Sequence, residues 1–319
     1  MDREGFEKLL IPFTQECNAG PIRTRRKRKR NTRRTAMRLK DRVFSANVTL
    51  AMTLRYMVGG IDTRTRQMEW VGKRRTIDRY ICFGVECLRC ALDRIEEGKI
   101  KMPSLSQMRS LARAVKRKCN AKGVTNTRLH GVFGFMDGTM HKSARPGNTE
   151  LQSQYYNGYH GVCGYKALYM TGSDGCILWA KLSRGTEYDN NLHSALHLEL
   201  HDIIPQGAGL AILGDSAFTP SDIMLRPYTE REKTHHMHRM EEVNRYNKEV
   251  SGLRIAAEWG VADVKKFNIF RAKFSVHHQA NQILAWEAGI RLHNFVARVS
   301  RINQTLNVFG GSAIEIDCE

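Results

Sequence analysis

Two apolar segments of this sequence each end on an aspartate, and this pattern limits the folds that the chain can adopt. Residues 133–137 read FGFMD, and residues 210–215 read LAILGD. Short apolar runs bounded by turn residues are typical of buried strands. One Asp-Gly pair is ordinary turn chemistry, but functional sites form at the ends of strands in α/β sheets. We therefore expect Asp137 and Asp215 to lie together at the end of two strands.

The segments around these strands predict an α/β core. Residues 159–182 have the pattern of two strands joined by a GSDG turn, and residues 191–204 have helical spacing. Residues 251–267 form an amphipathic pattern that carries Glu258. Strands mixed with helices favour a mixed sheet flanked by helices.

Charge separates the chain into two parts. The sequence has 51 basic and 32 acidic residues, a net charge of +19. Residues 1–130 hold 32 basic and 12 acidic residues, whereas residues 131–319 hold 19 and 20. One part is thus suited to bind a polyanion, and nucleic acid is the polyanion that we expect.

The basic part begins with a leader and continues as helices. Residues 1–45 include RTRRKRKRNTRR, which is too charged to pack and is typical of a disordered segment, a nuclear-import signal or a phosphate-binding arm. Residues 46–130 have the spacing of helices, the longest of which opens with four basic residues: Lys73, Arg74, Arg75 and Arg79. This order favours a helix-turn-helix DNA-binding region, and a plain helical bundle with a basic face is the alternative. We expect a separate α/β domain over residues 131–300 and a tail over 301–319.

Bulk properties favour a soluble, unsecreted protein with reduced cysteines. No apolar run approaches the ~18 residues that span a bilayer, and eight cysteines are scattered along the chain. His235, His236 and His238 lie close together in the sequence but lack a second pair of ligands at a recognised zinc spacing. We interpret these histidines as part of a solvated loop or helix face.

Three acidic residues are the candidate catalytic group. Asp137, Asp215 and Glu258 would repel one another if they converged without a cation, and Mg²⁺ or Mn²⁺ would keep them ionised. A pair of such ions can activate a water or 3′-hydroxyl and stabilise the leaving oxygen of a phosphodiester. Each acid taken alone could equally be a turn or capping residue.

Four segments then show a resemblance to a known family. FGFMDGTMHKSARP, QSQYYNGYHGVCGYKALYMTGSDGCILWA, LAILGDSAFTP and NKEVSGLRIAAEWGVA resemble, in this order, conserved blocks of PIF/Harbinger transposases and of the nucleases derived from them. The resemblance runs from about residue 48 to 300. It implies a ribonuclease-H-like fold, with Asp137, Asp215 and Glu258 as the catalytic, metal-binding acids. It aligns Asn247 and Arg254 with family positions as well.

The sequence departs from the family pattern at two places. Tyr188-Asp189 stands where the family usually has His-Asp, and Val261-Ala262 stands where it usually has Phe-Gly. Both departures leave the three acids intact. Asp189, Arg254 and Lys166 are candidates for supporting roles beside the acids or for contacts with DNA phosphates.

We therefore predict a metal-dependent, nuclear DNA endonuclease of transposase type that acts on double-stranded DNA. The main alternative is a transposase-derived DNA-binding regulator without cleavage activity, and an RNA-directed nuclease on the same fold is a third possibility. The resemblance implies a separate Myb-like partner protein, and cleavage at both ends of an element implies a homo-oligomer.

Overall fold

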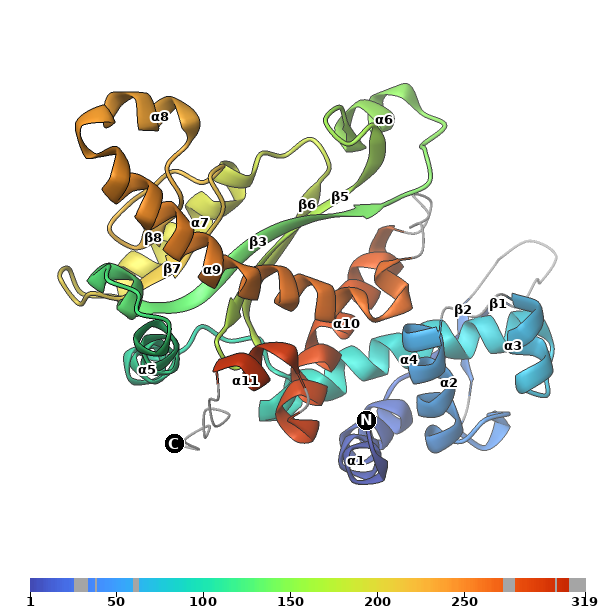
Figure 1. Ribbon diagram of the computed structural model, residues 1–319. Helices are drawn as coiled ribbons and strands as arrows, with labels where there is room; N and C mark the ends of the chain where they lie inside the picture. The colour runs from blue at the N-terminus through green and yellow to red at the C-terminus, as the bar shows by residue number, and fades with distance from the viewer. Residues whose placement is uncertain (26–33, 38, 60–62, 272–278, 302, 310–319) are drawn as a thin grey trace. The chain divides into compact units, whose positions relative to one another are not determined.

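The computed structural model describes the chain except for residues 26–33, 38, 60–62, 272–278, 302 and 310–319 (Figure 1). The chain forms two compact units. The helical unit contains Met1–Lys99 and Lys265–Ser300, and the sheet unit contains Ile100–Val264 and Arg301–Glu319. These units differ from the boundaries expected at residues 46, 131 and 300.

The helical unit consists of helices and one short antiparallel strand pair. Its elements are α1 (Arg3–Ala19), β1 (Ile22–Arg25), β2 (Arg34–Met37), α2 (Ala46–Gly59), α3 (Thr63–Glu69), α4 (Arg74–Arg94) and α10 (Gln279–Ser300), with 3₁₀ turns at Leu39–Asp41, Glu96–Gly98 and Asn268–Phe270.

The expected disordered leader contains an ordered helix in the structure. Leu9, Phe13 and Cys17 recur every four residues along α1 and are buried, so this segment has an apolar face that can pack. The Asp2 side chain accepts a hydrogen bond from the amide of Gly5 and caps the helix. Residues 26–33, the centre of the basic cluster, lie outside the described residues.

Helix α4 has the apolar face that the sequence predicts, and α10 packs along it. Near the end of α10, Arg298 Nη1 donates to the backbone carbonyls of Glu96, Glu97 and Lys99 at 3.0 Å. These carbonyls follow α4, so the guanidinium satisfies acceptors that the end of a helix leaves open. This packing explains why α10 belongs to the helical unit and not to the expected domain 131–300.

The sheet unit contains a six-stranded mixed sheet with helices on both faces (Figure 1). Its strands are β3 (Val132–Lys142), β4 (Tyr156–Asn157), β5 (Val162–Gly172), β6 (Ile177–Arg184), β7 (Ala211–Leu213) and β8 (Met224–Leu225). Its helices are α5 (Leu105–Ala121), α6 (Thr149–Tyr155), α7 (Asp189–Ile203), α8 (Glu230–His235), α9 (Met240–Lys265) and α11 (Gln304–Phe309), with 3₁₀ turns at Thr127–Gly131 and Met237–Arg239.

The strand order confirms the predicted fold class. Strands β6, β5 and β3 are antiparallel neighbours, and β7 and β8 follow β3 in parallel. Together with the flanking helices, this arrangement is that of a ribonuclease-H-like sheet. The predicted GSDG turn joins β5 to β6, and Gly175 adopts φ +77°, which favours glycine.

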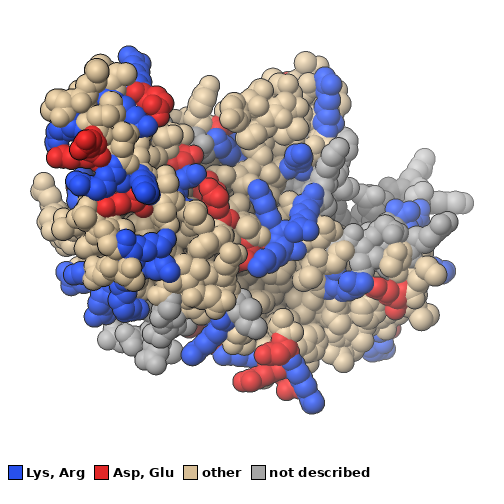
Figure 2. Space-filling model, in the orientation of Figure 1, with Lys and Arg blue, Asp and Glu red and all other residues tan. Residues whose placement is uncertain are grey.

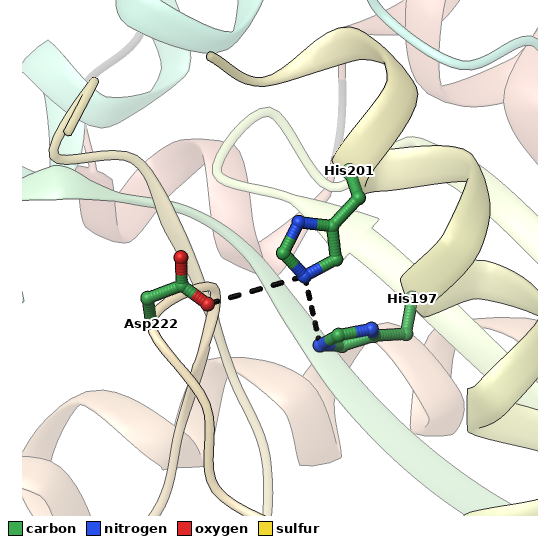
Figure 3. A group of neighbouring side chains, drawn as sticks. All are labelled: His197, His201 and Asp222. Atoms are coloured by element: carbon green, nitrogen blue, oxygen red, sulfur yellow. Dashed lines mark hydrogen bonds and ion pairs between the residues drawn. The ribbon is translucent and has the colours of Figure 1, made fainter. Parts of the chain in front are cut away.

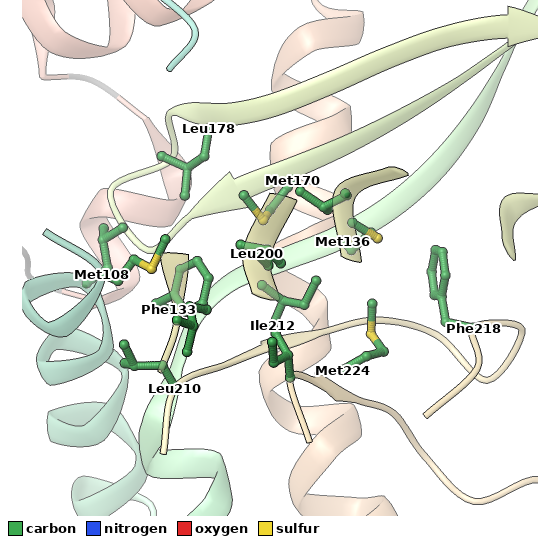
Figure 4. Packing of buried hydrophobic residues seen from close by; sticks show 14 of the residues in the cluster. Met108, Phe133, Met136, Met170, Leu178, Leu200, Leu210, Ile212, Phe218 and Met224 are labelled. Carbon is green, nitrogen blue, oxygen red and sulfur yellow. The ribbon is translucent and has the colours of Figure 1, made fainter. Parts of the chain in front are cut away.

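The two faces of the sheet have separate cores. On one face, Met136, Leu168 and Met170 of the sheet pack with Leu196 and Leu200 of α7 (Figure 4). On the other face, the side chains of β3 and β7 pack with those of α9, and Phe309 of α11 joins this core. Side chains alternate between the faces of a strand, and the neighbours Phe135 and Met136 of β3 accordingly belong to the α9 core and the α7 core.

None of the helices in the described ranges is long and apolar enough to span a membrane.

Candidate active site

Strands β3 and β7 bring the two aspartates together. In this parallel pair, Phe135 lies opposite Leu213. Asp137 and Asp215 each follow these partners by two residues, so both carboxylates leave the same edge of the parallel pair. Backbone amides orient them, because Gly138 N donates to Asp137 at 3.0 Å and Ala217 N donates to Asp215 at 2.9 Å.

The expectation that the first strand ends at Asp137 is wrong. Strand β3 continues to Lys142, and its pairing with β5 extends over Gly134–Lys142. Beyond Asp137, Thr139 and His141 alternate into the interior, which gives the strand a reason to continue. What ends near Asp137 is β7, the parallel neighbour, and the side chain of Asp137 is half-buried where that neighbour stops.

Helix α9 supplies the third acid on the same face. Phe135 packs in the core that α9 covers, and Asp137 shares its face because the two residues are two positions apart. Glu258 is exposed on α9, and Arg254, one turn earlier, donates to Glu258 Oε1 at 3.1 Å. Two residues after Glu258, α9 approaches the sheet very closely: a Cβ on Gly260 would lie 2.6 Å from Thr171 Cγ2 of β5.

Electrostatics link the three acids. Burial raises the pKa of Asp137 to about 6, and the negative charges of Asp215 and Glu258 raise it as well. The Gly138 amide and the Arg254 guanidinium lower it. Neighbouring carboxylates repel one another when all of them are ionised. A divalent cation bound between them removes this repulsion, so such a group is suited to hold one. The donor set therefore fits Mg²⁺ or Mn²⁺.

Among the candidates for supporting roles, Arg254 lies with the acids and Lys166 does not. Lys166 pairs with Met140 of β3, and alternation places it on the face opposite to Asp137. Asp189 begins α7, but its side chain lies outside the described part. Asn247 has a structural contact: its amide exchanges two hydrogen bonds with the backbone of Tyr228, at 2.8 and 2.9 Å.

The predicted DNA-binding residues lie in the helical unit, at the start of α4. Lys73, Arg74 and Arg75 are exposed, and Arg79 is half-buried. Arg74 lies 3.7 Å from Asp78, one turn along. The sheet unit has a different surface: basic and acidic side chains intersperse over α8 and the start of α9 (Figure 2), where Lys233–Glu230 and Arg239–Glu242 form ion pairs.

Sequence analysis missed one group of side chains that could hold a metal ion: His197, His201 and Asp222. The stretch LHSALHLELH on α7 was interpreted only as a helix, although it places His193, His197 and His201 four residues apart. Residues four positions apart lie on one face of a helix, so this spacing was the sequence pattern that could have indicated a cluster of histidines. Asp222 completes the group with His197 and His201. It lies in the loop before β8, and no local sequence pattern indicates that this loop lies beside α7.

Two aspartates from neighbouring strands, with a third acid on the covering helix, form an arrangement that can hold divalent cations of the kind used in phosphodiester cleavage. Residues 136–294 match the family model described as DDE superfamily endonuclease. This region is therefore similar to DDE superfamily endonuclease domains. No curated protein and no solved structure matched the chain.

Proposed function

We propose that this chain is a metal-dependent DNA endonuclease of the PIF/Harbinger transposase type. The observation that carries the proposal is the convergence of Asp137, Asp215 and Glu258 on the α9 face of the sheet, beside Arg254. The resemblance of four segments to the family blocks gives the finer assignment. Double-stranded DNA is the proposed substrate, and the nucleus is the proposed location.

The three acids would hold one or two Mg²⁺ or Mn²⁺ ions, which when bound supply an activated water or 3′-hydroxyl and stabilise the leaving oxygen. The charges of Asp215 and Glu258 both act on Asp137, so Asp137 would help to hold an ion together with either of them. Arg254 holds Glu258 through their 3.1 Å contact. The backbone amides of Gly138 and Ala217 orient the two aspartates. A homo-oligomer and a Myb-like partner would complete DNA recognition.

The first experiment incubates the purified protein with supercoiled plasmid and Mg²⁺, Mn²⁺ or chelator, beside the Asp215→Asn variant. We expect nicking that requires metal and is lost in the variant, because the variant lacks one anionic ligand. Intact DNA with both metals, even after nuclear extract and pre-cut terminal repeats are added, would favour the DNA-binding regulator instead. Stronger cleavage of RNA–DNA hybrids than of duplex DNA would favour the RNA-directed nuclease.

A second experiment tests the basic start of α4. Replacing Lys73, Arg74 and Arg75 together with alanine should weaken DNA binding and reduce the slope of log affinity against log salt by about 2 to 3, because each lost phosphate contact reduces it by about 0.9. The measurement is fluorescence anisotropy across a salt series. The matched variant replaces Lys116, Arg117 and Lys118 of α5 with alanine. Equal slopes in the two triple variants would contradict a specific role for α4.

A further inference from the structure

The sheet unit holds a second group of ligand side chains on the opposite face from Asp137. His197 and His201 lie on α7, which covers the Met136 face of the sheet, and Asp222 lies in the loop that precedes β8. Figure 3 shows the Nε2 atoms of the two tilted imidazole rings pointing toward each other, with the Asp222 carboxylate beside them. Their ligand atoms all lie within 4.8 Å of one another. We propose that these three residues form a zinc site, independent of the acid site and of the proposed cleavage activity.

The distances between the two imidazoles suit one shared ion. The Nε2 atoms of His197 and His201 are 3.2 Å apart. Two nitrogens bound to one tetrahedral zinc at 2.0–2.1 Å are separated by about 3.3 Å. The rings therefore already present their nitrogens at the spacing that a zinc ion requires.

The carboxylate needs only a small adjustment. Asp222 Oδ1 lies 4.0 Å from His201 Nε2, and the Asp222 side chain is 60% exposed. An exposed side chain can rotate toward an ion at low cost, since neighbouring atoms do not confine it. Three protein ligands then leave a fourth position for water, as in open zinc sites.

The loop that carries Asp222 is held in place. Ser221 Oγ accepts hydrogen bonds from the amides of Ile223 and Met224, at 3.3 and 3.0 Å, and it also lies 3.1 Å from His197 Nε2. Arg128 Nη2 donates to the carbonyl of Asp222 at 3.3 Å. The ligands from the helix and from the loop are thus oriented before an ion binds, which reduces the entropic cost of binding.

Two further observations point to a ligand here. His193, one turn before His197, is only 5% exposed, and its Nε2 has no hydrogen-bond partner among the described residues. Its ring lies edge-on to that of His197, with centroids 5.6 Å apart. A cavity of about 570 Å³ has His201 and Asp222 in its wall, together with Arg128, so an ion can enter from solvent.

The ligand types identify the ion. Two imidazoles and one carboxylate suit zinc and other transition metals, whereas Mg²⁺ and Mn²⁺ prefer oxygen ligands alone. The acid site and this site would therefore take different ions. Zinc bound here would connect α7 to the loop before β8 and stabilise that edge of the sheet.

The experiment measures Zn²⁺ binding by calorimetry, on the full chain with Asp215→Asn and saturating Mg²⁺ so that the acid site contributes little. His197→Gln/His201→Gln should weaken the tightest zinc binding by about 100-fold or more, because two of three ligands are lost. The matched variant His235→Gln/His238→Gln removes two exposed histidines of the neighbouring sequence and should bind zinc as tightly as its parent. Equal zinc affinity in all three proteins would overturn the proposal.

A milder variant keeps the test decisive if the double variant does not fold. Asp222→Asn changes an exposed side chain and should weaken zinc binding by about tenfold, since the amide is a poorer ligand than the carboxylate. Co²⁺ in place of Zn²⁺ gives a second readout, because its visible absorption reports tetrahedral coordination by nitrogen and oxygen. That absorption should be present in the parent and in the His235/His238 variant. An unchanged spectrum and affinity in Asp222→Asn would exclude Asp222 as a ligand. Neither readout depends on DNA cleavage, so failure here and failure of the nuclease proposal are separate results.

Discussion

Replacing Asp137 with asparagine is expected to abolish metal-dependent cleavage and, at the same time, to stabilise the metal-free protein at neutral pH. Cleavage should fall by about 10³-fold or more, because several kcal/mol of transition-state stabilisation depend on the ions that this acid helps to hold. Stability should rise, because the ionised carboxylate is partly buried and repelled by Asp215 and Glu258 when no cation is bound. The two effects have opposite signs, which a general folding defect would not produce.

The stabilisation should depend on pH in a defined direction. The pKa of Asp137 is about 6 in the folded protein and about 3.9 when the chain is unfolded. Below about pH 4 the carboxyl is protonated in both states, so the variant gains nothing. Between about pH 4 and 6 the wild type loses stability relative to the variant, and above pH 6 the full difference of about 1 to 2 kcal/mol is present.

Chemical denaturation at pH 4, 5, 6 and 7 with chelator would measure this difference. Added Mg²⁺ should then stabilise the wild type, by about 2.7 kcal/mol at 100 times the dissociation constant, and should stabilise Asp137→Asn much less. A variant that is less stable than the wild type at pH 7 without metal would contradict the burial argument. A variant that keeps its response to Mg²⁺ would remove Asp137 from the metal site.

The second large effect is expected at Gly260, where α9 approaches the sheet. Gly260→Ala places a Cβ 2.6 Å from Thr171 Cγ2 and 2.8 Å from Thr171 Oγ1. Thr171 is 1% exposed and has little space to move. The helix must shift, at a cost of about 2 to 3 kcal/mol. Glu258 lies half a turn away on α9, so cleavage should fall by about 10²-fold, which is the usual cost of a displacement of about 1 Å.

The same helix provides the matched control. Gly252 is also a helical glycine of α9, but nothing lies within 4 Å of a Cβ added there. Gly252→Ala should therefore stabilise the protein by about 0.5 to 1 kcal/mol and leave cleavage unchanged. Thermal unfolding and plasmid nicking would be measured for both variants and for Gly260→Ala/Thr171→Ala, which should recover part of both losses. Equal behaviour of the two glycine variants would show that the close approach does not position Glu258.

The neighbouring placement of Asp137 and Asp215 could be predicted from the sequence, because strand pairing determines it. Asp137 and Asp215 both follow short apolar runs, and parallel pairing of two such runs brings their ends together whatever the surrounding structure is. The face of Glu258 followed from the helical spacing of its apolar neighbours. The position of Lys166 could not be predicted in this way. Its strand was predicted, but the face of the sheet on which its side chain lies depends on the register between β5 and β3, which no local pattern specifies.

The remaining differences have tertiary causes. Strand β3 continues beyond Asp137 because β5 pairs with it over that length, and α10 joins the helical unit because Arg298 reaches carbonyls some two hundred residues away in the chain. Sequence analysis missed helix α1 because the strongly basic segment that follows it dominated the interpretation of residues 1–45. The His197–His201–Asp222 group needs a loop and a helix that only the fold brings together.

The place of α5 has a consequence for any shortened form of this protein. One side of α5 supplies Met108 and Leu111 to the α7 core, and another supplies Val115 to the α9 core. At the far end of the chain, Phe309 stacks on Phe135 at 5.4 Å, two residues before Asp137. A fragment cut at residues 131 and 300 would keep all three acids but would expose both cores to water. Expression of the sheet unit alone therefore has to begin before Leu105 and continue through Phe309.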